Sequence, residues 1–226
     1  MKKYLILFAL ILIHGCGGSD DTTYVPSDVP TDPTTVFQTF PTGYFTPGYT
    51  ETTNYTGTDT AGGTYTATMS EQTQPESSFL DVPAIPILVE LQMENTATGA
   101  STTAIATNYY TPVATDRRYL GYSDDTTETI SSTTNAIPQT VKIGDFGVTG
   151  TYTDNAGNVA VKSWRIDDAN NGNAYIVLLT SEADQFGNPT TSTVITTKID
   201  VNGNTLSETL VVYSATSGET LTLTSN

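Results

Sequence analysis

The sequence contains almost no histidine or cysteine. Its 226 residues include one of each, His14 and Cys16, and both lie close to the N-terminus. The rest of the chain therefore offers no Ser-His-Asp or Cys-His catalytic group and no disulfide bond. It also offers no histidine or cysteine ligand for zinc, copper, iron, haem or an iron–sulfur cluster. We expect no such cofactor, and any chemistry is left to carboxylate, lysine, tyrosine and hydroxyl groups.

Basic residues are scarce as well. Eight Lys and Arg residues stand against 24 Asp and Glu residues, which gives a formal net charge of −16. Such a field repels phosphate backbones, so nucleic acid is excluded as a partner. The sequence also lacks a G-x-S-x-G motif and a phosphate-binding glycine loop. We therefore expect the protein not to be an enzyme.

The sequence lacks an apolar run long enough to span a bilayer. Its longest run, Tyr4 to Ile13, has ten residues, about half of the roughly 20 that a spanning helix needs. Lys2 and Lys3 precede this run, and Gly15 and Cys16 close it. A positive start, a short apolar run and a small residue before the cleavage point are the three parts of a bacterial export signal.

The residues Ile13-His14-Gly15-Cys16 at the end of this signal resemble the lipobox of bacterial lipoproteins. The resemblance implies that residues 1–15 are a signal peptide that is removed. It also implies that Cys16 receives a diacylglyceryl group and an amide-linked acyl chain such as palmitate. We expect a protein of the bacterial cell envelope that is held at the outer membrane by membrane lipid on Cys16. Removal of residues 1–15 would lower the net charge to about −18.

The segment after the lipobox has the composition of a linker. Pro26, Pro30 and Pro33 are spaced among Thr, Ser and Asp residues, and apolar residues are few. Such a segment cannot bury enough surface to fold, so residues 16–36 are predicted to form a flexible, acidic linker. Residues 37–226 are predicted to form the folded domain.

Alternating side chains predict strands in this domain. In residues 64–69 and 87–94, apolar side chains recur at every second position, which is typical of half-buried strands in an antiparallel sheet. Pro83 and Pro86 argue against a central strand immediately before Ile87. Residues 37–55 interleave aromatic residues with Thr, Gly and Pro, and predict either an edge strand or a strap across the domain.

Glycines at regular intervals predict the order of these strands. Gly157, Gly172, Gly187, Gly203 and Gly218 recur every 15 or 16 residues, each within a cluster of turn-forming residues. Glycine and asparagine tolerate positive φ, so each cluster predicts a hairpin turn. About ten strand residues between turns are usual in an up-and-down meander.

Together these patterns predict an all-β fold. We expect a single antiparallel up-and-down meander whose sheet is curled or barrel-like. A possible boundary between two smaller sheets lies near residues 124–138, but one domain is the favoured organisation. The oligomeric state is not predicted.

A calcium site is one candidate for function. Alternate turns of a meander lie at the same end of the sheet, so the turns at Gly172 and Gly203 should be neighbours. Their possible oxygen ligands are Asp167, Asp168, Asp200, Asn202 and Asn204. Thr205 and Val211, however, stand where a calcium loop would carry its glycine and its bidentate glutamate. We expect these residues to serve turn formation, with calcium as the alternative.

Aromatic residues are the other candidates for a site. A face that stacks on sugars, or a ligand pocket, could include Tyr109, Tyr110, Tyr119, Tyr122 and Trp164. Aromatic residues are also ordinary packing residues of β-sheets. For any one of them we expect packing before ligand contact.

These observations lead to three hypotheses for function. The first is a non-enzymatic β domain, displayed from the outer membrane, that contacts a glycan, a protein or another envelope component. The second is a lipocalin-like barrel that carries a small apolar ligand, for which a cavity inside the sheet would be the distinguishing feature. The third is a carboxylate-dependent enzyme acting on glycans.

Overall fold

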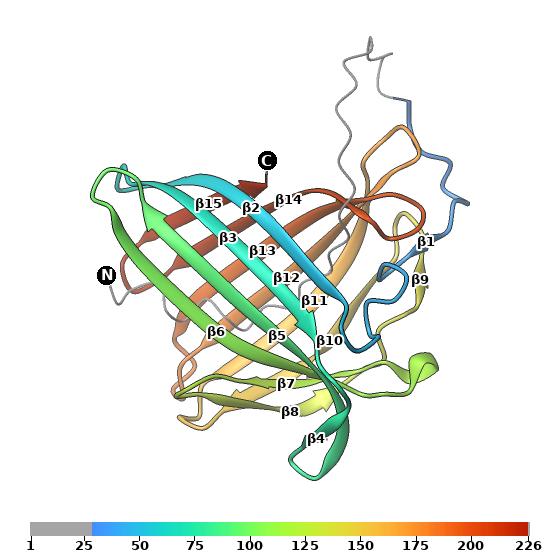
Figure 1. Ribbon diagram of the computed structural model, residues 1–226, viewed down its shortest axis with the longest axis horizontal. Helices are drawn as coiled ribbons and strands as arrows, with labels where there is room; N and C mark the ends of the chain where they lie inside the picture. The colour runs from blue at the N-terminus through green and yellow to red at the C-terminus, as the bar shows by residue number, and fades with distance from the viewer. Residues whose placement is uncertain (1–28, 226) are drawn as a thin grey trace.

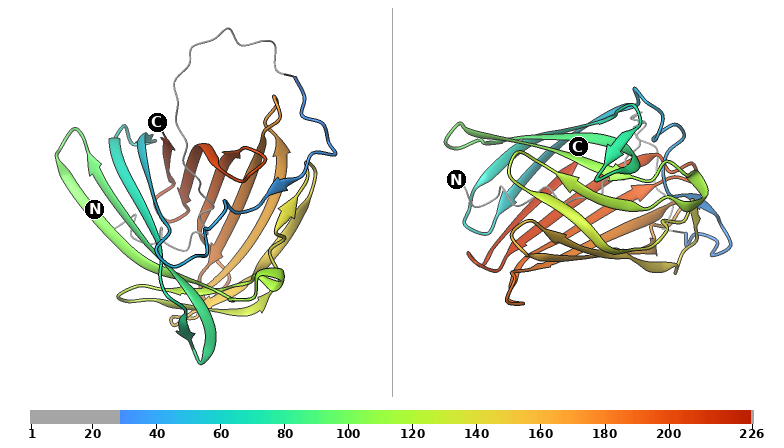
Figure 2. Two further views of the ribbon diagram at one scale, coloured as in Figure 1. Left: turned by 45° about the vertical axis from the view of Figure 1, so that its right-hand side comes forward. Right: turned by 90° about the horizontal axis from the view of Figure 1, so that it is seen from below.

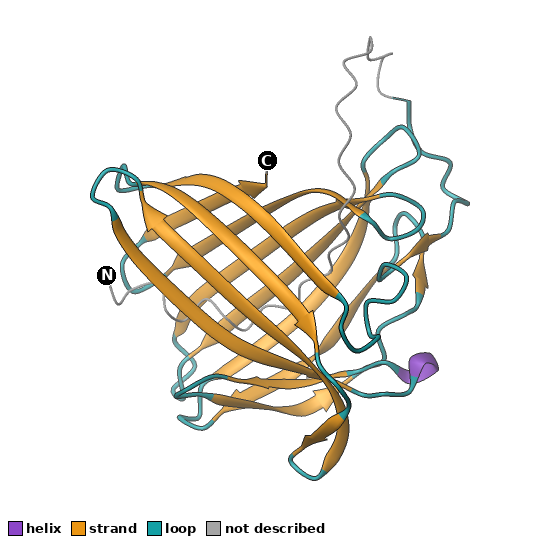
Figure 3. Ribbon diagram, in the orientation of Figure 1, coloured by secondary structure: helices purple, strands orange, loops and turns teal. Residues whose placement is uncertain are grey.

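The computed structural model describes residues 29–225, and its architecture is almost entirely β. Within these residues the sole helix is a 3₁₀ turn at Ala114–Asp116 (Figure 3). No helix in this part of the chain is long and apolar enough to cross a membrane. The predicted signal peptide, Cys16 and the first part of the linker lie outside the described residues.

Twelve antiparallel strands close into a barrel (Figure 1). Each barrel strand pairs with the next one along the chain, and the last strand, β15, pairs with the first, β2. Their bounds are β2 Thr50–Asp59, β3 Thr64–Thr73, β5 Val82–Asn95, β6 Ala100–Tyr110, β7 Tyr119–Ser123, β8 Glu128–Thr134, β10 Phe146–Asp154, β11 Val159–Asp168, β12 Ala174–Ala183, β13 Pro189–Ile199, β14 Thr205–Ser214 and β15 Glu219–Ser225. The up-and-down all-β fold is confirmed, and the curled sheet is a closed barrel.

The two-residue alternation of the sequence separates the interior of the barrel from its surface. On β3, the side chains of Ala67, Met69 and Glu71 are buried inside the barrel, whereas those of Thr64 and Thr66 lie exposed outside. Because side chains of a strand point alternately to the two faces, one strand supplies both a core and a polar coat. Threonine suits the outer face, since its branched side chain fits a pleated strand.

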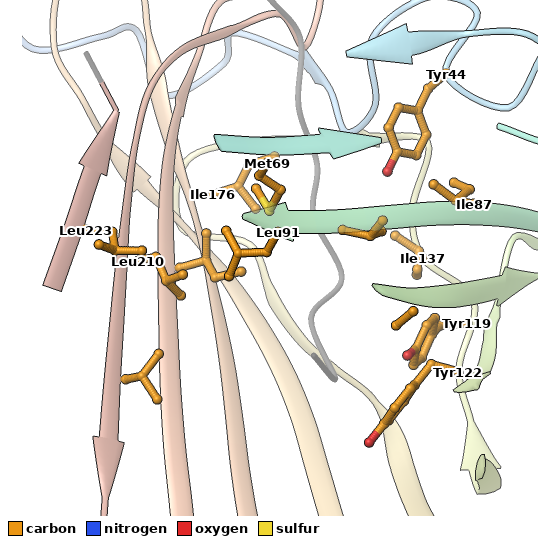
Figure 4. Close-up of a cluster of buried hydrophobic side chains, with 14 of the residues drawn as sticks. Tyr44, Met69, Ile87, Leu91, Tyr119, Tyr122, Ile137, Ile176, Leu210 and Leu223 are labelled. Carbon is orange, nitrogen blue, oxygen red and sulfur yellow. The ribbon is translucent and has the colours of Figure 1, made fainter. Parts of the chain in front are cut away.

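Apolar side chains from opposite walls fill the middle of the barrel. Met69 on β3 and Leu91 on β5 lie together with Ile176, which comes from β12 on the far wall (Figure 4). The strands of the two walls cross in the view from below (Figure 2). Each buried Leu or Ile stabilises the fold by about 1.5–3 kcal/mol. Side chains therefore occupy the central lumen that a ring of twelve strands would otherwise enclose.

A strap formed by residues 37–49 covers one end of the barrel, which we call the closed end. Its first residues form β1 (Phe37–Gln38), which pairs with β9 (Thr140–Val141). Phe45 then packs against Phe40 and Tyr110, with ring centroids 4.7 and 5.3 Å apart. The Arg117 guanidinium lies 3.9 Å from the centre of the Phe45 ring. The predicted strap is thus present, and β2 follows it.

The segment before the strap also contacts the closed end. The backbone nitrogen of Thr31 donates to the Asp168 carboxylate at 3.2 Å, and its hydroxyl donates to the Asn173 carbonyl at 3.0 Å. The backbone nitrogen of Asn171 donates to the carbonyl of Val29 at 2.7 Å. The described end of the segment predicted as a linker is therefore hydrogen bonded to the turn between β11 and β12.

Three hairpin turns share the pattern Asp-x-x-Gly-Asn, beginning at Asp154, Asp184 and Asp200. In each turn one carboxylate oxygen accepts from the backbone nitrogens two and four residues later. The other oxygen accepts from the side-chain amide of the asparagine. The glycines have φ between 80° and 85°, which other residues rarely adopt. The predicted glycine turns are therefore also capped by their own aspartates.

The prediction that no central strand lies immediately before Ile87 agrees with the structure, in which each residue from 82 to 86 pairs with a strand on one side only. Strand β5 begins at Val82 and includes Pro83 and Pro86. Pairing between β3 and β5 starts only at Ile87, so residues 82–86 extend beyond the end of β3. The first three of these residues pair instead with the short strand β4 (Ser77–Phe79). Proline is tolerated there because the strand is locally close to an edge.

Candidate functional site

A cavity of about 520 Å³ opens at the end of the barrel opposite the strap, which we call the open end. The hairpin turns β7–β8, β10–β11 and β12–β13 lie at this end (left in Figure 1). Residues on the cavity wall are Thr103, Ala104, Ile105, Tyr122, Asp124, Asp125, Thr126, Thr127, Thr129, Tyr152, Asp154, Asn155, Ala156, Asn158, Val159, Ala160, Glu182 and Thr190. The volume is within the range of about 300–1,000 Å³ that is usual for small-molecule sites.

Two aspartates of the rim are fixed by their own turns. One oxygen of Asp124 accepts from the backbone nitrogens of Thr126 and Thr127, each at 2.7 Å. Asp154 uses both carboxylate oxygens within its Asp-x-x-Gly-Asn turn. These hydrogen bonds hold negative charge in place around the mouth of the cavity.

The inner wall is a row of residues on three neighbouring strands. Ala160 on β11 pairs with Tyr152 on β10 and with Glu182 on β12, so the three side chains share the inner face. Tyr152 is fully buried, and Glu182 is partly buried. Burial raises the pKa of the Tyr152 phenol well above its usual value. Burial likewise raises the pKa of the Glu182 carboxyl to about 7, an effect that Lys162 partly offsets.

Lys162 lies deeper in the barrel, behind this row. Its side chain is 2% exposed. Its ammonium nitrogen lies 4.5 Å from the ring centre of Tyr119 and 5.7 Å from that of Tyr152. Burial lowers the pKa of Lys162 to about 7, and attraction to Glu182 opposes this shift. The interior thus places one ammonium group among aromatic rings, close to one carboxylate.

A buried hydroxyl also belongs to the cavity wall. Thr129 on β8 is 3% exposed. Its hydroxyl oxygen has no partner within the described residues at ordinary hydrogen-bond distance and angle, although it lies close enough to the Tyr122 phenol to lower the pKa of that group. Tyr122, its cross-strand partner on β7, is buried, and this raises the pKa of the Tyr122 phenol to about 12. Buried hydroxyl groups nearly always have a partner. The Thr129 hydroxyl is therefore a position where a bound molecule could supply one.

Of the five aromatic candidates, Tyr122 alone lies on the cavity wall. Tyr110 and Tyr119 are buried in the interior, with ring centres 5.4 Å apart. Tyr109 lies on the outer face of β6, where it stacks on Phe79 with ring centres 4.1 Å apart. Trp164 packs against the hydrophobic core. The neighbouring positions of Tyr119 and Tyr122 are visible in Figure 4.

The calcium candidates lie on the two predicted neighbouring turns at the closed end, but each carboxylate has a local role. Asp168 accepts from Thr31 and Asn170, Asp200 is bound within its own turn, and Asp167 forms an ion pair with Arg165 at 2.9 Å. The side-chain amide of Asn204 donates to Asp200, and Asn202 is exposed. Within residues 29–225, no three acidic, histidine or cysteine side chains are grouped to hold a metal ion.

Sequence reasoning did not identify Thr129, Tyr152, Lys162 or Glu182. A signal for two of them was present. Lys162 lies an even number of positions from Ala160 and Ile166 on β11, so it shares their face of the strand. Glu182 shares a face of β12 with Ile176 in the same way. An ionisable residue on the apolar face of a strand is buried, and buried charges are costly. Such residues are therefore candidates for function.

The outer surface carries a second feature, which we call the outer apolar patch. It runs along adjacent strands and consists of Ile130 on β8, Phe146 and Val148 on β10, and Val159 and Val161 on β11. Phe146 is 81% exposed and Val148 is 50% exposed. Contiguous exposed apolar side chains are typical of a contact surface.

No protein-family model matches the chain, and no curated protein or solved structure is significantly similar to it. The function is therefore inferred from the chemistry of the cavity and of the surface.

Proposed function

We propose that the protein is a lipid-anchored barrel of the bacterial envelope that binds a small molecule in the cavity at its open end. The observation that carries this proposal is the cavity of about 520 Å³, closed below by Tyr152, Ala160 and Glu182. Concave sites with a few polar groups among apolar and aromatic side chains are the usual form of ligand sites. We therefore favour the carrier hypothesis over the display hypothesis, and the polar groups on the wall support a ligand that is not purely apolar.

Native mass spectrometry of the full-length protein tests the binding function. We expect additional mass of roughly a few hundred daltons, as a cavity of this size allows, that is lost under denaturing conditions. Ala160→Trp should abolish the additional mass, because Ala160 lies on the inner wall and a larger side chain would fill the cavity. Thr66→Trp, on the exposed face of β3, is the matched control and should retain it. The proposal would be contradicted if the native mass of the wild-type protein equalled its mass under denaturing conditions.

The lipid anchor is supported by the lipobox-like sequence that ends at Cys16. Cells grown with a radioactive fatty acid should label the wild-type protein but not Cys16→Ala, since the thiol is the site of diacylglyceryl transfer. Labelling of both proteins, or of neither, would contradict the anchor without bearing on the cavity.

Contact with an envelope protein is a second candidate function, and the outer apolar patch favours it. The patch lies on the outer face and the cavity opens at the end of the barrel, and Val159 is the one residue that belongs to both. The two functions can therefore coexist in one molecule.

A further inference from the structure

The charge on the cavity wall narrows the class of ligand. Four carboxylates line the cavity, from Asp124, Asp125, Asp154 and Glu182. The one basic group nearby, Lys162, lies behind Glu182 and is not among the wall residues. The whole chain is also strongly acidic, with a net charge of −16. A concave site lined by one sign of charge concentrates ions of the opposite sign. The cavity therefore favours cations over anions.

The arrangement of these carboxylates does not suit a metal ion. Asp124 and Asp154 are engaged by their own turns, and residues 29–225 contain no group of three ligands placed around one metal position. A calcium ion needs six to eight oxygen ligands at 2.3–2.6 Å, in a space far smaller than this cavity. An organic cation fits both the volume and the single carboxylate on the inner wall.

The groups around Glu182 can bind such a cation. The rings of Tyr122 and Tyr152 lie on the same wall, and aromatic faces attract ammonium groups. The barrel already holds one ammonium in this way, because Lys162 lies over Tyr119 and near Tyr152. The Thr129 hydroxyl, which has no hydrogen-bond partner in the described structure, can accept from an N–H donor.

We propose that the cavity binds a small organic ammonium ion, with its charged group at Glu182 and its hydrocarbon part against Tyr122 and Ala160. This inference rests on the proposed binding function and specifies the ligand class of the same site. The ammonium donates to the Glu182 carboxylate. The hydrocarbon part leaves water for the apolar side of the wall.

Two probes of nearly equal shape test the inference. Phenethylamine carries an ammonium group, and phenethyl alcohol carries a neutral hydroxyl in its place. Isothermal titration calorimetry with the full-length protein should show that the amine binds at least tenfold more tightly than the alcohol. Glu182→Gln should remove this preference and leave the affinity for the alcohol unchanged. Glu94→Gln makes the same change on the exposed face of β5 and should keep the preference.

The outcomes separate this inference from the proposed function. Equal affinity of the wild-type protein for both probes would overturn the ammonium proposal and leave a cavity that binds neutral molecules. Failure of both probes would also overturn it, while native mass spectrometry would still decide whether the cavity holds any molecule. The wild-type comparison needs no variant, so a loss of folding in Glu182→Gln cannot hide the result.

Discussion

Replacement of Gly57 by alanine is expected to destabilise the protein by about 3 kcal/mol or more, because it opens the barrel at its closing pair of strands. Gly57 on β2 lies opposite Leu223 on β15. A Cβ atom at Gly57 would lie 2.7 Å from Leu223 Cδ2 and 2.9 Å from Leu223 Cα, and would overlap the carbonyl oxygen of Thr222. Backbone atoms cannot yield here without breaking hydrogen bonds between the two strands.

The same hairpin offers a matched control for this prediction. Gly62, in the turn between β2 and β3, has φ of +90°, and a Cβ atom at this position would have no neighbouring atom within 4 Å. Gly62→Ala therefore strains the backbone without a clash, and should cost about 1–2 kcal/mol. Urea denaturation followed by circular dichroism measures both changes. Equal effects of the two substitutions would show that the contact between β2 and β15 does not limit stability.

The second large effect is expected in the pH dependence of stability, and it comes from Lys162. Burial lowers the pKa of Lys162 in the folded protein from 10.5 to about 7. Between these values the unfolded chain binds the proton that the folded protein releases, so stability rises with pH across this interval. Below pH 7 both states carry the proton, and the full cost of burying the ammonium remains.

Lys162→Met isolates this effect. From pH 7 to pH 9.5, the free energy of unfolding of the wild-type protein should rise relative to that of Lys162→Met by on the order of 3 kcal/mol. Glu182 contributes in a different window, because its pKa is raised from 4.5 to about 7. The stability that it adds is present below pH 4.5 and is lost as pH rises toward 7. Without Lys162 the pKa of Glu182 rises further, because Lys162 lowers it in the wild-type protein. Glu182 then also loses its proton above pH 7 in Lys162→Met, which enlarges the expected difference in the same direction.

Lys142→Met is the control for the change in net charge. Lys142 is exposed, so Lys142→Met removes the same charge without changing a buried group. The difference between this variant and the wild-type protein should stay constant over the same interval. A constant difference for Lys162→Met as well would mean that Lys162 is not buried as an amine in the folded protein.

Local patterns in the sequence predicted the strands and their order. The alternation in residues 64–69 and the glycines at intervals of 15 or 16 residues each act within one hairpin. Hairpin pairing depends on neighbouring residues and can be read from them. The closure of the barrel could not be predicted in this way. It depends on the register of β15 against β2, more than 150 residues apart in the chain, and a curled open sheet has the same local pattern.

The candidate site was harder to predict than the fold. Tyr119 and Tyr122 are only three positions apart in the sequence, yet Tyr122 lines the cavity and Tyr119 is buried behind it. Residues three positions apart on a regular strand point to opposite faces, but both tyrosines face inward here because the pairing of β6 with β7 is irregular: Tyr110 pairs with Tyr119 but Tyr109 pairs with Gly121. Irregularities of this kind shift which side chains face inward. Their positions are set by tertiary structure and leave no periodic signal.

The hydrogen bonds of Thr31 with Asp168 and Asn173 set the direction from which the chain joins the barrel. They lie at the closed end, and the cavity opens at the opposite end. If Cys16 is acylated as we propose, the tether joins the barrel at the end away from the cavity entrance. The tether and a bound ligand then occupy opposite ends of the molecule, so neither blocks the other.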